Sequence, residues 1–445
     1  MDKIAIIGAG FCGVALCYSL RKKFPNSSIT IYSRSSLIGS GVAYGTNSPF
    51  HLLNVPAGRM GMIDGQENDF YLWLCEQGYT YHPEDFVPRK LYGEYLRSYF
   101  VKTPSLTVVR SNVIAIQTNH ESAHIVTDKD DMHQVDLAIL ALGNFPSKIP
   151  QGITNLPWES SSNCISDPWH PASQANKLLT ISPSANVLLI GSGLTALDIA
   201  SLLLDKGIKS IVAMSRNGVL PQPHRGLHVI PEVAVSCDSI IRQSSLRLKL
   251  HQFRMTLSQV RNNGGDWRDL FIELRKITPE LWQSLSIVEQ SKFLKKIAPF
   301  WETHRHRISP QLHAKITEAI KNKLVTFYKA NCISATMING VIQVSTSSKK
   351  IPTIRADCII NCTGPNVDIT KEKDPLIEQL VKQGTIIPDS HNLGLQVTNT
   401  YRTVNSRGEV NKNLLYLGPL LKAKYYEATA VPELRAHVKQ LVSLL

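Results

Sequence analysis

The feature that most constrains this fold is a glycine-rich turn that occurs twice. "GAGFCG" starts at Gly8 and "GSGLTA" starts at Gly191, each after a short aliphatic run and before an apolar helical pattern. A strand leading into Gly-x-Gly-x-x-(Gly or Ala) and then a helix is typical of a dinucleotide-binding βαβ unit. One copy would be weak evidence. Two copies in the same context predict two nucleotide-binding halves in one chain.

Each small residue of the motif has a physical task. The first glycine allows the tight turn, the second lets backbone amides approach a pyrophosphate, and the third lets the helix pack closely on the strand. We expect strands at 4–7 and 187–190 and helices at 14–23 and 197–205. The predicted pyrophosphate contacts are Gly8, Gly10 and Gly13 in the first copy and Gly191, Gly193 and Ala196 in the second.

The residue at the end of the next strand indicates the nucleotide. An acidic residue there binds a ribose 2′-hydroxyl, whereas an arginine accommodates a 2′-phosphate. Counting 25 residues from each first glycine reaches Ser33 in the first copy and Arg216 in the second. Arg216 favours NADP over NAD, the alternative being an exposed arginine at a strand end. Ser33 stands where an FAD site usually has a glutamate, although its hydroxyl can still bind a ribose.

Two further segments repeat each other. Residues 136–146 and 356–366 are each a hydrophobic strand that runs into a glycine, Gly143 in the first and Gly364 in the second. Each nucleotide-binding half therefore has an opening glycine-rich turn and a closing strand. This repetition predicts an α/β fold with two Rossmann-like dinucleotide-binding domains, one nested in the other, and a helical insertion in the second.

The expected domain limits follow from these changes of pattern. We predict an FAD-binding domain, first part, at 1–170; an NAD(P)-binding domain, first part, at 171–231; a helical insertion at 232–323; and the returns of the two domains at 324–366 and 367–445. Within the insertion we expect turns at 263–265 and at Pro279. Residues 107–118 and 123–127 are expected to be strands of a meander, and 39–62 a long loop.

Composition narrows the class of protein to which the chain can belong. The chain has 445 residues, enough for two or three domains, and no apolar run near the roughly 18–20 residues that a membrane-spanning helix needs. The first strand starts almost at residue 1, so we expect no signal peptide. Eight cysteines without a disulfide framework suit a reducing cytoplasm, and the absence of Cys-x-x-Cys argues against a flavin–disulfide reductase.

The net charge of +13 is concentrated in one region. Residues 242–323 hold 16 Lys and Arg against 7 Asp and Glu. Such a basic stretch is most simply a solvated helical face, and it can also attract an anionic substrate, a lipid or a nucleic acid. The stretch lacks the aromatic and basic pattern of a nucleic-acid-binding strand, so we expect a small-molecule partner, an anionic one being an option. The oligomeric state stays open.

With these residues in view, the chain resembles a bacterial family of FAD/NAD(P)-binding proteins. It is more remotely similar to the flavin monooxygenases that N-hydroxylate ornithine and lysine. The resemblance covers essentially the whole chain and rests on "GVAYGTNSPFHLLNVPAGRM", "LIGSGLTALDIA", "SRNGVLPQPH", "WETHRHR" and "LGPLLKAKYYEATAVPELR".

The resemblance implies two cofactors, FAD in the first half and NADPH in the second. It implies that the loop around His51, Asn54, Arg59 and Met60 approaches the flavin ring. It also implies that Gly418 lies against the ribitol or the flavin and that the helix starting near Val431 points its N-terminus at the ring. His51 and Glu427 are the candidates for acid–base catalysis, although no side chain stands out from its pattern alone.

The stretch "THRHR" (303–307) raises the question of a metal. His304 and His306 would face different directions on a helix, and no cysteine or carboxylate cluster stands beside them, so we expect no metal site. An anion contact by Arg305 or Arg307, to substrate or NADP, is favoured over a metal, and structural pairing is the simplest interpretation of the stretch. Trp267, Trp282 and Trp301 are expected to be core residues.

The sequence therefore favours an FAD-dependent oxidoreductase that is reduced by NADPH, with a monooxygenase slightly preferred. The alternatives are a flavin reductase or dehydrogenase without oxygen insertion, and a dinucleotide-sensing binding protein without turnover. A structural flavoprotein is a further alternative, supported mainly by Ser33.

Overall fold

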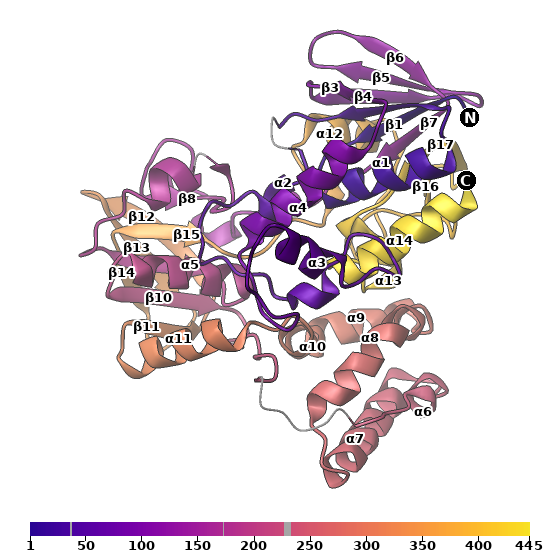
Figure 1. The fold of residues 1–445 in the computed structure, drawn as a ribbon. Coiled ribbons are helices and arrows are strands. Elements are labelled where there is room, and N and C mark those ends of the chain that lie inside the picture. Colours follow the sequence, from indigo (N-terminus) through magenta and orange to yellow (C-terminus); the bar gives the residue numbers. More distant parts are fainter. Residues whose placement is uncertain (36–37, 172, 227–232) are drawn as a thin grey trace.

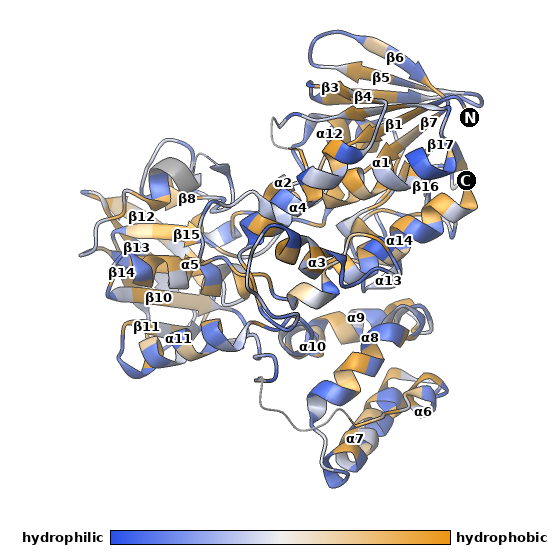
Figure 2. Cartoon of the chain, in the orientation of Figure 1, coloured by the Kyte–Doolittle hydropathy of each residue, from blue (hydrophilic) through white to orange (hydrophobic). Residues whose placement is uncertain are grey.

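The computed structural model describes residues 1–35, 38–171, 173–226 and 233–445. Two parallel sheets lie side by side, and a group of helices lies below them in the view of Figure 1. Hydrophobic residues are concentrated in the strands, as Figure 2 shows. In the part of the chain that the structure describes, we find no helix with the length and apolar character needed to cross a membrane.

The first sheet has the strand order β16-β17-β7-β1-β2-β3. Its strands are β1 (Lys3–Ile7), β2 (Ser28–Tyr32), β3 (Leu106–Val109), β7 (Leu137–Leu140), β16 (Arg402–Val404) and β17 (Val410–Tyr416). All its pairs are parallel except β16 with β17. Strand β1 is buried in its last four residues, as expected for a central parallel strand covered on both faces.

Helices surround this sheet. Helix α1 packs against α4 and α14, and α12 packs against β4. The bounds are α1 (Phe11–Lys23), α2 (Gly41–Tyr44), η1 (Ala57–Arg59), α3 (Asp69–Glu76), α4 (Arg89–Lys102), η4 (Ile369–Lys371), α12 (Pro375–Lys382), η5 (Pro419–Leu421), α13 (Lys422–Tyr425) and α14 (Val431–Leu444). The stretch 39–62, predicted as a loop, thus contains the short helices α2 and η1.

The expected single strand at 107–118 is wrong, because it is two strands in different sheets. Strand β3 joins the parallel sheet, whereas β4 (Val113–Thr118) begins an antiparallel sheet with β5 (Ala123–Thr127) and β6 (Met132–Val135). The carboxylate of Asp128 accepts hydrogen bonds from the hydroxyl of Ser111 and from the amide of Asn112. These bonds stabilise the break between the two strands.

The second sheet has the order β11-β10-β9-β15-β8, and every pair in it is parallel. Its strands are β8 (Cys164–Ile165), β9 (Asn186–Ile190), β10 (Ser210–Ser215), β11 (Val325–Lys329) and β15 (Cys358–Asn361). Around it lie η2 (Gln151–Ile153), η3 (Ser173–Leu178), α5 (Leu194–Asp205), α11 (Pro310–Lys321) and an antiparallel sheet of β12 (Cys332–Ile338), β13 (Val341–Thr346) and β14 (Thr353–Ala356).

The predicted fold class is confirmed: the chain has two Rossmann-like parallel sheets, and one is inserted in the other. It leaves the first sheet after β7, builds the second sheet, and returns with β16 and β17. Leu414 of β17 pairs with Ala138 of β7. Strand β8 lies before the expected domain limit at 171. The expected limit between 231 and 232 lies outside the described residues.

The predicted helical insertion contains α6 (Asp238–Ile241), α7 (Leu246–Asn262), α8 (Trp267–Gln283), α9 (Ile287–Lys296) and α10 (Ala298–Arg305). The last helix within the predicted bounds of the insertion, α11, packs instead on α5 and β11 of the second sheet. The turn at 263–265 separates α7 from α8. The predicted turn at Pro279 is wrong, because Pro279 lies inside α8, where proline removes one backbone hydrogen bond and the amphipathic packing of the helix persists.

The three tryptophans of the insertion surround an apolar cavity of about 280 Å³ among α6, α7, α8, α9 and α10. Trp282 is buried, as predicted for a core residue, whereas Trp267 and Trp301 are half-buried.

Candidate active site

The first glycine-rich turn joins β1 to α1 and is closed on one side and open on the other. Gly8 has a φ of +111°, and a Cβ there would stand 2.3 Å from the carbonyl oxygen of Ala141. A Cβ at Gly13 would stand 2.0 Å from the carbonyl oxygen of Gly8. At Gly10 the nearest atom would be 3.8 Å away, and no side chain caps the helix. The open amide end of α1 suits a pyrophosphate.

The second turn has the same geometry. Gly191 has a φ of +125°, and a Cβ there would stand 2.3 Å from the carbonyl oxygen of Cys362. Gly193 adopts φ −83° and ψ −166°, against −82° and −160° at Gly10, and a Cβ on it would meet nothing within 4 Å. Ala196 is fully buried, where α5 packs on the turn. Both turns therefore fit a dinucleotide.

Gly143 and Gly364 occupy equivalent places after β7 and β15. Their φ values are +69° and +88°, and at either position a Cβ would meet nothing within 4 Å. The strand before each runs beside the strand that enters the corresponding turn. The structure thus places each glycine at the strand ends where its nucleotide would lie.

The two candidate ribose residues differ in their surroundings. Ser33 is buried, and its hydroxyl donates to the carbonyl oxygen of Ser35 at 2.9 Å. Arg216 is exposed after β10, and the structure shows no ion-pair partner for it among the residues it describes. The neighbouring Ser215 hydroxyl accepts from Ser192 of the second turn at 2.7 Å. Arg216 therefore lies beside that turn, as a 2′-phosphate contact requires.

His51 is buried in the segment between α2 and η1 and does not line the cavity described below. Its Nδ1 lies 2.7 Å from the hydroxyl of Thr46. Burial, with a contribution from the nearby Arg89, lowers the pKa of His51 to about 3, so the ring is neutral. A catalytic task for His51 stays a prediction.

The other residues of this segment are held by two side chains that the sequence did not single out. The ring of His224 donates from Nε2 to the backbone oxygen of Asn54 at 2.9 Å. Arg435 of α14 donates to the backbone oxygen of Arg59 at 3.0 Å. Met60 is buried. Asn54 and Arg59 line the cavity, and His224 belongs to the quoted motif "SRNGVLPQPH".

At the return of the first domain, Gly418 approaches the chain closely. A Cβ there would stand 2.7 Å from the hydroxyl oxygen of Tyr416. Helix α14 begins after Ala430 without a side-chain cap, and Ala430 lines the cavity. The N-terminal end of α14 therefore borders the cavity, and a helix N-terminus favours negative charge nearby.

The cavity has a volume of about 730 Å³ and lies where three parts of the chain meet. Lining residues come from the first domain, including the residue before α14, from the segment after β10, and from α8, α10, the following turn and the start of α11. They are Asn54, Val55, Pro56, Arg59, Glu84, Asp85, Phe86, His224, Arg225, Gly226, Arg268, Ile272, Arg275, Arg305, His306, Arg307, Pro310, Gln311 and Ala430.

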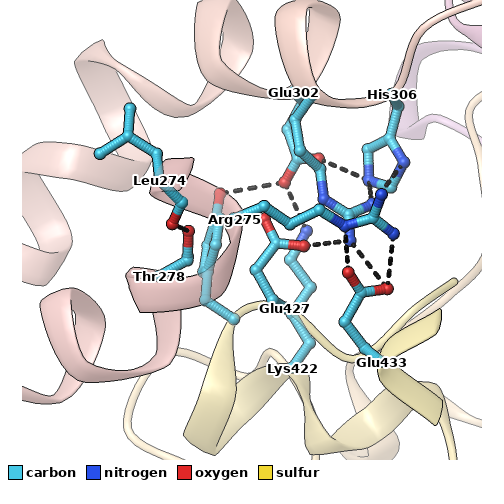
Figure 3. Close-up of polar contacts among 10 residues, drawn as sticks. Leu274, Arg275, Thr278, Glu302, His306, Lys422, Glu427 and Glu433 are labelled. Atoms are coloured by element: carbon cyan, nitrogen blue, oxygen red, sulfur yellow. Dashed lines mark hydrogen bonds and ion pairs between the residues drawn. The ribbon is translucent and has the colours of Figure 1, made fainter. Parts of the chain in front are cut away.

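A network of charges beside the cavity joins the helical insertion to the start of α14 (Figure 3). Arg275 of α8 binds Glu433 with two nitrogens, and Arg305 of α10 pairs with both Glu427 and Glu433. Burial alone would raise the pKa of Glu433, but Arg305 and Arg275 outweigh it and lower the pKa to about 2. The carboxylate of Glu427 is thus engaged by Arg305. Its acid–base task stays a prediction.

The same network contains Glu302. Lys422 donates to this carboxylate at 2.7 Å, Tyr426 donates to it at 3.0 Å, and Nε2 of His306 lies 3.0 Å from it. Burial alone would raise the pKa of Glu302, but Lys422 and His306 hold it well below its usual range. Three carboxylates therefore balance three cations, and the insertion is tied to the first domain.

A second buried ion pair joins the two nucleotide domains. Arg89 of α4 donates to Asp198 of α5 at 2.6 Å, and both side chains are largely buried. Burial raises the pKa of Asp198, against the opposing effect of Arg89. Sequence periodicity missed this pair, although Asp198 lies in the quoted "LIGSGLTALDIA".

The two histidines of "THRHR" point to different partners. His304 bonds the backbone oxygen of Phe300 and stacks near Phe271, whereas His306 pairs with Glu302. Within the described ranges, no three His, Cys, Asp or Glu side chains gather as a metal site would require.

Comparison with known proteins agrees with this geometry. The profile of one protein family, described as FAD-NAD(P)-binding, matches residues 5–145. The uncharacterized protein YdhS of Escherichia coli (strain K12) is 24% identical over 315 residues, covering 60% of this chain. The match spans 56% of that relative's length.

Solved structures share the fold. The ornithine N-hydroxylase of Kutzneria sp. 744, in a structure with reduced FAD, NADP⁺ and L-ornithine, has a TM-score of 0.65 at 13% identity and covers 100% of this chain and 98% of its own. The ornithine hydroxylase PvdA of Pseudomonas aeruginosa has 0.60 at 12%, with the same coverage. The bacillithiol disulfide reductase of Bacillus cereus has 0.55 at 14%, covering 99% and 98%.

Proposed function

We propose, starting from the FAD-NAD(P)-binding domain at residues 5–145 and the two-dinucleotide flavoprotein fold around it, that this protein is an FAD-dependent oxidoreductase reduced by NADPH. The observation that carries the proposal is the position of the cavity. Both nucleotide domains and the helical insertion contribute to its wall. A site of this kind, at a domain interface with several convergent polar groups, is where a substrate and two cofactors can meet.

We assign one cofactor to each domain. Gly8, Gly10 and Gly13 would hold the pyrophosphate of FAD, since this turn shares its sheet with β17, which leads to α14. Gly193 and Arg216 would hold NADPH at the second turn. When bound, NADPH would supply a hydride and FAD would accept it. The chain would orient the two rings and exclude water.

The cysteines in or next to the two glycine-rich turns and β15 support oxygen as the acceptor of electrons rather than a disulfide. Cys358 and Cys362 are buried in and after β15, and Cys12 is buried in α1. Burial raises the pKa of the Cys12 and Cys358 thiols to about 12, so these thiols are neutral. We therefore propose a monooxygenase acting on a small molecule, with a flavin reductase or dehydrogenase as the second candidate.

The test is anaerobic mixing of the FAD-loaded protein with NADPH while its absorption is recorded. We expect the visible absorption band of the flavin to bleach, and NADPH to act far better than NADH. Gly193→Ala is the matched control, because it should block reduction by NADPH and leave reduction by dithionite intact. A protein that binds no FAD, or an FAD-loaded protein that NADPH never bleaches, would contradict the proposal.

Readmission of air separates the two candidates. A monooxygenase yields a hydroxylated product in proportion to NADPH consumed when its substrate is present. A reductase or dehydrogenase yields no oxygenated product with any substrate that accelerates NADPH oxidation.

A further inference from the structure

Arginines dominate the wall of the 730 Å³ cavity. They are Arg59, Arg225, Arg268, Arg275, Arg305 and Arg307. Five of them have carboxylate partners. These pairs are Arg59 with Glu84, Arg225 with Asp266 and Asp269, Arg268 with Asp266, Arg275 with Glu433, and Arg305 with Glu427 and Glu433.

Arg307 differs from the other five. Among the residues that the structure describes, no carboxylate pairs with it, and its buried Nε has no hydrogen-bond partner. Its guanidinium lies over an aromatic ring, with Cζ 5.5 Å from the centre of the Trp267 ring. A cation–π contact of this kind leaves the in-plane donors of a guanidinium free for another acceptor.

The charges around Arg307 are of its own sign. Burial, together with Arg268 and Arg275, lowers the pKa of Arg307 to about 10, and the carboxylate of Asp266 offsets this only in part. A half-buried guanidinium without a counter-ion is costly, because the low dielectric around it strengthens the repulsion. An anion in the cavity would remove that cost.

The backbone holds Arg307 in place. Ile308, the next residue, donates its amide to Gln222 at 3.0 Å and accepts from the amide of His224 at 2.9 Å. The ring of His224 is bonded in turn to the loop at Asn54. Arg307 thus projects from a segment paired with the second domain, and a preorganised donor binds with less loss of entropy than a mobile one.

We propose that Arg307 is the receptor for an oxyanion, a carboxylate or phosphate group, of the substrate in this cavity. The inference rests on the proposed function and adds the chemical class of the substrate to it. Of Arg305 and Arg307, the two arginines that the sequence singled out, Arg305 is occupied by Glu427 and Glu433. Planar guanidinium groups bind carboxylate and phosphate oxygens with two parallel hydrogen bonds, which gives orientation as well as affinity.

The test uses the FAD-loaded protein with acetate and inorganic phosphate as separate probes, followed by the quenching of tryptophan fluorescence and by thermal unfolding. At constant ionic strength we expect saturable binding of at least one probe and a rise in Tm with its concentration. Arg307→Gln should weaken that binding at least 10-fold, and Arg307→Lys should weaken it less. Arg254→Gln, at an exposed arginine of α7, is the matched control and should bind as the native protein does.

Two measurements keep the outcome separate from the proposed function. Without an added substrate, Arg307→Gln should be bleached by NADPH like the native protein. Because Arg307 lacks a counter-ion, its removal should leave the Tm equal or higher, which shows that the variant folds. Equal probe binding by the native protein and by Arg307→Gln would overturn the inference. A loss of NADPH affinity in place of probe affinity would also overturn it, because the anion would then belong to the cofactor.

Discussion

A single methyl group at Gly193 should separate the binding of NADPH from the stability of the fold. The backbone of Gly193 has φ −83°, which any residue adopts, and a Cβ there meets nothing within 4 Å. Gly193→Ala therefore causes no clash in the protein itself. It also reduces the conformational freedom of the unfolded chain, which stabilises a protein by about 0.4–1 kcal/mol.

The same methyl group would occupy the space that a pyrophosphate needs. If it displaces the phosphates from two backbone amides, each worth about 1.5–3 kcal/mol as a hydrogen bond to a charged group, the loss is at least about 3 kcal/mol. That corresponds to a rise of more than about 100-fold in the Kd for NADPH. Affinity and stability should thus change in opposite directions.

Titration of the FAD-loaded protein with NADPH and thermal unfolding without NADPH measure the two effects. Gly191→Ala is the contrasting variant: its φ of +125° and the 2.3 Å approach to the carbonyl oxygen of Cys362 predict a lower Tm. A Kd for NADPH that Gly193→Ala leaves within twofold of the native value would refute the assignment of this turn. A large fall in the Tm of Gly193→Ala would refute the inference that a Cβ at this position causes no clash.

Two further predictions concern charged side chains. Arg216→Ala should raise the Kd for NADPH far more than that for NADH, because only the former carries a 2′-phosphate; titration with both nucleotides checks this, and equal losses would contradict it. Because the pKa of Glu433 is lowered to about 2, the stability it contributes, about 3 kcal/mol, is fully present above pH about 4.5 and is lost as the pH falls towards 2. Urea unfolding at pH 6 and pH 3.5 should show that Glu433→Gln destabilises more at pH 6, and an equal effect at both would contradict the assignment.

The parts of the site that sequence analysis found are those where local backbone geometry dictates the residue. Gly8 and Gly191 adopt positive φ, and a side chain at either would collide with the backbone at the end of a neighbouring strand. The presence of glycine at these positions therefore predicts the turn. Gly143 and Gly364 also adopt positive φ, but the pattern that predicts them is the hydrophobic strand before each.

The sequence singles out Asn54, Arg59, Arg305 and Arg307, which line the cavity. The ion pairs beside the cavity could not be predicted, since they join distant segments. Arg275 meets Glu433 and Arg305 meets Glu427 only because the insertion docks on α14 and on the segment before it. Helical periodicity predicts only which face of each helix is buried. Pro279 shows the same limit. The local preference of this proline for a turn is overridden by the packing of α8. The residues next to it in the sequence do not predict that packing.

The insertion of one sheet in the other has a consequence for how the chain matures. Strand β7 obtains its neighbour β17 only after the whole of the second sheet has been synthesised, since Ala138 pairs with Leu414. During translation the inner domain can therefore be complete while the outer one still has a bare strand edge, the kind of surface that invites mispairing between nascent chains. The outer domain also cannot be excised as one continuous fragment, so recombination that exchanges this domain between relatives would need two crossovers.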